Sequence, residues 1–349
     1  MYNFNGFAPN ISFFGACNSF NGFKSHFPQI FDPQKFTRIF ILKGGPGTGK
    51  SSLMRSVGAY YSRLGLYTEA IYCSSDPTSL DGIIVKHSGQ SIAIIDGTSP
   101  HATEAKYPGL IEKTTNLENS ISSSILSGSR DRILELNRKK TEGYRNAYLA
   151  LSGCGEIFKV LKAELSVFSR NIAAEISAKY GFKECNQHIN TTTHTIRIES
   201  SFSKFGATSL NRNDENKTVI SVGTTPLMGG IILHTLYTDY LCGDRDLTIC
   251  PSPLSSDLID RIYTKDYIFE TSFGSYPTIE IDSMLPYTNR LSDAIECYNK
   301  ALELARSMFS YASDMHFALE DIYKRSMDFE NNERIHDEII KETNTLLGI

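Results

Sequence analysis

The sequence of 349 residues lacks the features that would mark it as a membrane, secreted or disulfide-stabilised protein. No stretch reaches the ~18 consecutive apolar residues that a membrane-spanning helix needs. The first residues, Met1 to Asn5, show no basic segment followed by an apolar one, so no signal peptide is indicated. The seven cysteines are widely spread and form no C-x-x-C pair, which is typical of reduced thiols. We therefore expect a cytoplasmic protein without a membrane partner.

Charge of one sign is not in marked excess either, since 35 Lys and Arg residues stand against 39 Asp and Glu residues. This balance disfavours a protein that coats nucleic acid and gives no indication of a nucleic-acid partner, although a local basic groove stays open. With 40% hydrophobic and 21% charged residues, the composition is ordinary for a globular chain and argues against intrinsic disorder. The length favours two domains.

Buried strands and a helix alternate in the first part of the chain. Residues 38–42, 68–73 and 91–95 are apolar runs typical of strands buried on both faces of a parallel sheet, and residues 51–57 place apolar side chains on one helix face. This order predicts an α/β fold with a parallel sheet. From about residue 118 to 179 the apolar residues recur with a helical period.

After about residue 191 the same pattern begins again, with short matching words in the same order in both parts. The pairs are Phe14-Gly15-Ala16 with Phe205-Gly206-Ala207, Pro46 with Pro226, Cys73 with Cys250, Leu80-Asp81 with Ile259-Asp260, Ile94-Ile95-Asp96 with Ile268-Phe269-Glu270, and Tyr107-Pro108 with Tyr276-Pro277. Chance matching of short apolar words is the alternative. We predict a duplicated fold with domains at residues 1–193 and 194–349, each ending in a long helical segment.

Residues 44–51, Gly-Gly-Pro-Gly-Thr-Gly-Lys-Ser, fit the pattern G-x4-G-K-[ST] of a phosphate-binding loop (P-loop), between a predicted strand and a predicted helix. Glycines let backbone N–H groups curl around a phosphate, and the helix N-terminus points its positive end at the same group. Lys50 is expected to reach the β- and γ-phosphates of ATP, and the Ser51 hydroxyl to ligate Mg²⁺. A glycine-rich turn without a ligand is the alternative. The residues predicted to bind ATP are Gly45, Pro46, Gly47, Thr48, Gly49, Lys50, Ser51 and Ser52.

Asp96 ends an apolar strand about 46 residues after Lys50 and is the second predicted ligand of Mg²⁺, with a plain strand-end cap as the alternative. No Glu follows Asp96, so the group that polarises water must come from elsewhere. Asp76 and Asp81 follow the strand that ends at Cys73, and the carboxyl ends of parallel strands border a ligand crevice. We name Lys50, Asp96 and Asp76 as catalytic, and an Asx-turn or loop cap is the alternative for Asp76 and Asp81. Further candidates to sense the γ-phosphate are Thr98, Ser99 and His101, and for His101 a packed or surface role is the simpler expectation.

The second part of the chain lacks the groups that bind phosphate and metal. Gly230 stands where Lys50 stands in the first part, Ile231 replaces Ser51, and Glu270 is matched to Asp96. An isoleucine offers no oxygen to a metal ion, so we expect no Mg-nucleotide in this half. Its predicted role is structural or regulatory, for example to supply an arginine to the first site. The candidates are Arg197, Arg245 and Arg261.

Four segments together resemble a family of poorly characterised bacterial tandem P-loop ATPases. They are Phe13-Phe14-Gly15-Ala16, the loop with its preceding strand (residues 38–51), Cys73-Ser74-Ser75-Asp76 with Ser79-Leu80-Asp81-Gly82, and residues 93–101 around Asp96. The resemblance covers nearly the whole chain and implies ATP binding and hydrolysis, but no substrate. Members of the family carry a usable loop in both halves, whereas this chain departs from them at Gly230 and Ile231.

The leading hypothesis is therefore an Mg²⁺-dependent ATPase with one competent site in the first half. A small-molecule or nucleoside kinase, with Asp76 or Asp81 as the acceptor's base, is one alternative. A nucleotide-gated scaffold with little turnover is another. No N-K-x-D segment of the GTPase kind occurs near the end of the first half, which favours ATP over GTP. A protein partner is left open.

Overall fold

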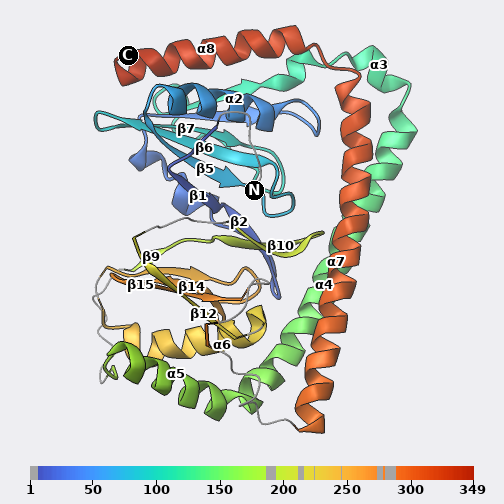
Figure 1. Ribbon diagram of the computed structural model, residues 1–349. Coiled ribbons are helices and arrows are strands. Elements are labelled where there is room, and N and C mark those ends of the chain that lie inside the picture. The colour runs from blue at the N-terminus through green and yellow to red at the C-terminus, as the bar shows by residue number, and fades with distance from the viewer. Residues whose placement is uncertain are drawn as a thin grey trace. The chain divides into compact units, whose positions relative to one another are not determined.

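The computed structural model describes residues 7–185, 194–210, 216–223, 225–244, 246–272, 278–279 and 288–349. The chain divides into two compact units (Figure 1). Unit 1 comprises Met1–Ala16, Ser25–Arg145 and Met308–Ile349, and unit 2 comprises Cys17–Lys24 and Asn146–Ser307. The predicted boundary at residues 193/194 separates the two large sheets. Each compact unit nevertheless takes residues from both predicted ranges.

Unit 1 is built on a six-stranded sheet. The strand order is β1 (Ile11–Phe14), β5 (Tyr67–Tyr72), β6 (Leu80–His87), β7 (Gln90–Asp96), β4 (Arg38–Lys43) and β8 (Glu112–Asn116). Strand β4 is parallel to β7 and β8, and β1 is parallel to β5, but β6 is antiparallel to both of its neighbours. The prediction of an α/β fold is confirmed, whereas the prediction of a parallel sheet is wrong for β6. The chain between β6 and β7 is too short for the crossover that parallel strands require.

The apolar runs of the sequence form the core of unit 1. Ile39 and Ile41 of β4, Ile84 of β6 and Ile95 of β7 belong to one buried cluster. Helix α2 (Lys50–Arg63) covers the sheet with the apolar face expected for residues 51–57, where Leu53, Met54 and Val57 are buried. Short elements complete the connections: α1 (Phe27–Ile30), η1 (Pro33–Lys35), η2 (Leu117–Ser120) and α3 (Ser123–Ser127).

Long helices follow the sheet strands, as the helical periods predict. They are α4 (Arg130–Glu164), α5 (Ser166–Tyr180), α7 (Asn289–Lys324) and α8 (Phe329–Leu347). Within unit 1, α8 lies beside α2 (Figure 1), and the Tyr61 hydroxyl donates a 2.8 Å hydrogen bond to Asn344. Glu342 pairs with Arg38 at 3.0 Å. None of the described helices is long and apolar enough to cross a membrane.

Unit 2 contains a five-stranded sheet in the order β12 (Thr218–Val222), β15 (Tyr267–Thr271), β14 (Ile259–Tyr263), β13 (Thr248–Pro251) and β9 (Thr195–Ile196). Helix α6 (Pro226–Leu236) follows β12 and continues into a π-helical turn, η3 (Tyr237–Leu241). Two hairpins complete the strands: β2 (Ala16–Ser19) with β3 (Gly22–Ser25), and β10 (Ser200–Ser203) with β11 (Gly206–Ser209).

The two sheets share strand order and direction. In chain order, β1, β4, β5, β6 and β7 of unit 1 correspond to β9, β12, β13, β14 and β15 of unit 2, and β6 and β14 are the antiparallel middle strands. Each middle strand carries one extra residue at the same place in its ladder, Asp81 in β6 and Asp260 in β14. The two sheets therefore share a β-bulge at matching aspartates.

The strand positions correct three of the matches drawn from sequence. The hairpin of β10 and β11 corresponds to that of β2 and β3, each with a two-residue turn, so Gly206 at the start of β11 matches Gly22 and not Gly15. Leu42 pairs with Asp96 in unit 1, and Val222 pairs with Thr271 in unit 2. Thr271 therefore occupies the position of Asp96, and Glu270 does not. Likewise Cys250 pairs with Arg261 as Ile71 pairs with Gly82, so Cys250 corresponds to Ile71 and not to Cys73. The match of Tyr276-Pro277 falls outside the described residues.

Candidate functional site

The predicted phosphate-binding loop connects β4 to α2 in unit 1. Gly47 (φ +74°) and Gly49 (φ +87°) adopt left-handed backbone conformations, which glycine enters without steric cost. Helix α2 begins at Lys50, directly after Gly49, so its unpaired N-terminal N–H groups face the loop. This strand–loop–helix order and these two glycine conformations are what the sequence pattern requires.

The ammonium group of Lys50 contacts the backbone of the loop. Its Nζ donates hydrogen bonds to the carbonyl oxygens of Gly44 (2.7 Å) and Gly45 (2.9 Å), and it lies 3.7 Å from Asp96 Oδ2. The Lys50 side chain is only 10% exposed. A mostly buried cation held by neutral carbonyls and one carboxylate favours an anionic ligand.

Asp96 reaches the same edge of the sheet as the loop because β7 runs parallel to β4 and pairs Asp96 with Leu42. Its Oδ1 accepts hydrogen bonds from the Thr98 N–H (2.9 Å) and the Thr98 hydroxyl (2.5 Å), while Oδ2 faces Lys50. Ser51 Oγ accepts a hydrogen bond from the Leu80 N–H at 2.9 Å. Thr98, proposed as a phosphate sensor, thus orients the Asp96 carboxylate.

The donor atoms at this edge fit Mg²⁺. A hydroxyl and a carboxylate are hard oxygen ligands, and Mg²⁺ is usually held by one or two protein oxygens together with water and phosphate oxygens. The described residues include no group of three or more His, Cys, Asp or Glu side chains arranged for a metal ion.

Asp76 serves a local turn. Its Oδ1 accepts hydrogen bonds from the Thr78 N–H (3.1 Å) and the Thr78 hydroxyl (2.7 Å), which is the geometry of an Asx-turn between β5 and β6. Arg55 donates to the Thr78 carbonyl at 2.6 Å and fixes the same turn. This is the alternative that the sequence left open for Asp76. Asp96 makes the same two hydrogen bonds with Thr98, and it differs from Asp76 in that its second oxygen faces Lys50.

Asp81 and His101 form a buried pair. The sequence named both residues as candidates but did not predict that they contact each other. His101 Nε2 lies 3.2 Å from Asp81 Oδ2, and the two residues are 7% and 6% exposed. Burial raises the pKa of Asp81, and the hydrogen bond from His101 partly opposes this rise. The ring of His101 stacks on Phe27 with centroids 4.0 Å apart. The sequence named Asp81 as a candidate because it follows the strand that ends at Cys73, but nothing local pointed to His101 as its partner.

Residues near the C-terminus contact the outer side of the loop within unit 1. A Cβ atom added to Gly45 would lie 3.3 Å from the Tyr323 ring, and one added to Gly47 would lie 2.6 Å from the Glu320 carbonyl oxygen. Asn332 Nδ2 donates a 2.8 Å hydrogen bond to the Thr48 carbonyl. These contacts join residues more than 270 positions apart, so no local sequence pattern predicts them.

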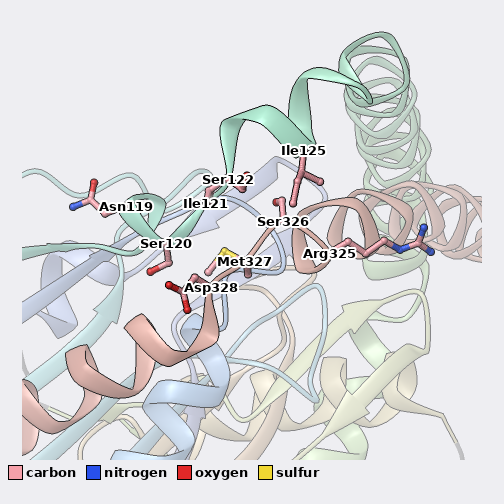
Figure 2. Close-up of a pocket in the computed structure, with 9 residues that line it drawn as sticks. All are labelled: Asn119, Ser120, Ile121, Ser122, Ile125, Arg325, Ser326, Met327 and Asp328. Atoms are coloured by element: carbon pink, nitrogen blue, oxygen red, sulfur yellow. The ribbon is translucent and has the colours of Figure 1, made fainter.

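A hollow of about 320 Å³ lies between η2 and the turn that joins α7 to α8, also within unit 1 (Figure 2). It is lined by Asn119, Ser120, Ile121, Ser122, Ile125, Arg325, Ser326, Met327 and Asp328. Backbone hydrogen bonds from Asp328 to Ser120 and from Ser122 to Ser326 join its two sides. Figure 2 shows the Arg325 side chain extending away from Ser120 and Asp328. None of the predicted loop residues lines this hollow, so it carries no part of the site.

Unit 2 uses its corresponding turn for packing. The Thr225 hydroxyl caps α6 by accepting from the Met228 N–H at 3.3 Å. A Cβ atom at Gly229 would lie 2.4 Å from the Val222 carbonyl oxygen, and Gly230 and Ile231 are buried. Gly229 allows α6 to approach β12 closely, and Gly230 lies against Leu258 and Ile259 at the start of β14, so both glycines have a packing role.

The arginines considered for the first site have partners in unit 2. Arg261 pairs with Glu199 and with Glu270, each at 2.8 Å, and Arg197 lies 3.5 Å from Glu199. Tyr263 donates a further hydrogen bond to Glu199 at 2.6 Å. Breaking such a buried network is costly, which argues against release of Arg261. Arg245 lies outside the described residues.

Comparison of the chain with protein-family models, with curated proteins and with solved structures found no match. The resemblance to tandem P-loop ATPases therefore stays a prediction. The loop at residues 44–51 and the residues around it are the features of the chain that bear on its function.

Proposed function

We propose that unit 1 binds ATP with Mg²⁺ and hydrolyses it at a single site. The observation that carries this proposal is the position of Lys50. Its ammonium lies in the loop before α2, where Gly47 and Gly49 have positive φ. It is 3.7 Å from the carboxylate of Asp96, which ends the parallel neighbouring strand β7. Phosphate-binding loops combine these parts because the backbone N–H groups, the helix N-terminus and the lysine all favour a polyphosphate.

Binding exchanges the partners of Lys50. The carbonyl oxygens of Gly44 and Gly45 hold the ammonium in the free protein. Phosphate oxygens carry full negative charge and make stronger hydrogen bonds to an ammonium than neutral carbonyls do. When bound, Mg²⁺ would supply charge neutralisation between the β- and γ-phosphates, with Ser51 and Asp96 as its protein ligands.

We propose that unit 2 arose by duplication of the same domain and binds no Mg-nucleotide. The shared strand order and the matching bulges at Asp81 and Asp260 support the duplication. Ile231 offers no metal ligand, and Gly230 offers no cation. All seven cysteines are free thiols, which supports a reducing compartment such as the cytoplasm.

A nucleotide-gated scaffold is the second candidate, and the contacts of the C-terminal helices favour it. Tyr323, Glu320 and Asn332 all lie against the loop. A ligand that changes the loop would therefore bias the position of these helices within unit 1. The two candidates share the binding site and differ in turnover.

The test is equilibrium binding and turnover of ATP by wild type and by Lys50→Ala. Loss of a charge-assisted hydrogen bond should weaken Mg-ATP binding at least ~10-fold and abolish hydrolysis. Lys86→Ala is the matched control, because Lys86 belongs to the same sheet and pairs with Glu69 instead. GTP in the same titrations tests the preference for ATP. Binding that survives unchanged in Lys50→Ala contradicts the proposal, and tight binding without turnover selects the scaffold.

A further inference from the structure

Hydrolysis at this site lacks an assigned base. The residue after Asp96 is Gly97, and Asp76 is engaged in its turn. Attack on a γ-phosphate needs a group that orients the incoming oxygen and accepts its proton. The inference below rests on the proposed function and asks which side chain of unit 1 does this.

The bulge in β6 brings Asp81 to the edge of the sheet that carries the loop. Strand β6 is antiparallel to β7, so it begins where β7 ends, and Gly82 pairs with Ile95. Asp81 is the unpaired extra residue just before Gly82, next to the position of Asp96. Its neighbour Leu80 donates directly to Ser51, the residue after Lys50. Asp81 therefore follows a residue that is hydrogen-bonded to Ser51 and precedes a residue that pairs with Ile95, the neighbour of Asp96.

Contacts with His101 surround the Asp81 carboxyl group. His101 Nε2 lies 3.2 Å from Asp81 Oδ2, and its Nδ1 shares a 3.3 Å hydrogen bond with the Ser25 hydroxyl. Ser25 Oγ in turn accepts from the Phe27 N–H at 3.3 Å. Stacking on Phe27 holds the ring in place. A buried carboxylate held by an oriented imidazole is an arrangement that general bases use.

We propose that Asp81 is the general base of this site, with His101 and Ser25 as its positioning residues. In the step assigned to it, the oxygen of water bonds to the γ-phosphorus while the bond from that phosphorus to the β,γ-bridging oxygen breaks. The electron pair leaves with ADP. Asp81 accepts the proton of the attacking water, and His101 stays beside Asp81 Oδ2.

Unit 2 supplies a natural control for this assignment. Asp260 occupies the same bulge and is 5% exposed, but it accepts its hydrogen bond from the Ser200 hydroxyl. The neighbouring turn carries Gly230 and Ile231 in place of the lysine and serine. Replacement of Asp260 by asparagine therefore repeats the chemical change in the same structural position without a phosphate-binding loop beside it.

The experiment measures kcat, KM and equilibrium Mg-ATP affinity for wild type, Asp81→Asn, His101→Phe, His101→Gln and Asp260→Asn, with a melting temperature for each. Asp81→Asn should lower kcat ~100-fold or more with unchanged affinity, the usual effect of losing a general base. His101→Phe keeps the stack on Phe27 but removes the donor, so kcat should fall. His101→Gln restores a donor and should recover part of the loss. Asp260→Asn should leave kcat unchanged.

The outcomes separate this inference from the proposed function. Wild-type turnover by Asp81→Asn, or a joint loss of turnover, ATP affinity and melting temperature, overturns the assignment of Asp81 and leaves ATP binding standing. A wild-type protein that binds ATP but does not hydrolyse it does the same. A wild-type protein that binds no nucleotide overturns both.

Discussion

At the scale of single residues, aspartates that follow strands in similar sequence contexts differ in burial and in the groups they contact. Asp76 fixes a turn, Asp96 faces Lys50, and Asp81 is buried against His101. Asp260 is buried in unit 2, where burial raises its pKa to about 6 against the hydrogen bonds from Ser200 and Ser252. The same residue type thus titrates differently according to the groups that replace water around it.

The raised pKa of Asp260 makes stability depend on pH. The folded state holds this proton more tightly than the unfolded state does, so the free energy of unfolding should fall as pH rises from 4 to 7. A shift from 3.8 to about 6 corresponds to a loss of about 2 kcal/mol over this range. Asp260→Asn carries no titrating group and should lack this fall, whereas Asp293→Asn on exposed α7 should keep it. Urea denaturation at each pH measures the difference, and parallel curves for wild type and Asp260→Asn would contradict it.

At the scale of elements, the loop and the C-terminal helices depend on one another. Two features require glycine at position 47. Its φ is positive, and a Cβ atom there would lie 2.6 Å from the Glu320 carbonyl oxygen of α7. Tyr323 and Asn332 add contacts from the end of α7 and from α8. The loop is therefore shaped by tertiary packing as well as by its own glycines.

Gly65 provides a matched control for this packing, because it has the same φ of +74° and nothing within 4 Å of an added Cβ atom. Gly65→Ala should cost ~1–2 kcal/mol, the strain of a left-handed alanine. Gly47→Ala should cost clearly more, since α7 must also move away from the loop. Urea midpoints give the two costs, and hydrogen exchange over residues 308–349 should rise only in Gly47→Ala. Equal costs would mean that the helix contact contributes nothing.

At the scale of the whole molecule, the sequence predicts elements better than their connections in space. The strand at residues 38–43, the loop and the start of α2 follow from an apolar run, glycines and a lysine within fifteen residues. The helices at residues 289–324 and 329–347 follow from their period. The strand at residues 80–87 was not predicted, and an apolar run does not encode strand direction, so β6 and its antiparallel placement were both missed.

The residues of the candidate site likewise fall into those that a local motif predicts and those that depend on long-range pairing. Lys50, Ser51 and Asp96 were predicted because a local motif and one strand end define them. The pairing of Asp81 with His101 depends on a bulge, and the contact of Asn332 with Thr48 joins residues 284 positions apart. The equivalence of Thr271 with Asp96 became visible only through ladder register. Long-range pairing and register shifts are the features that a single sequence specifies least.

The central claim is that the loop at residues 44–51 binds the phosphates of ATP and its counterpart in unit 2 binds none. A crystal structure of the protein with Mg²⁺ and a non-hydrolysable ATP analogue tests this claim most directly. The account predicts phosphates on the loop N–H groups, Lys50 turned from Gly44 and Gly45 to the β- and γ-phosphates, and Mg²⁺ between Ser51 and Asp96. An empty loop, or nucleotide bound beside Gly230 instead, would contradict it.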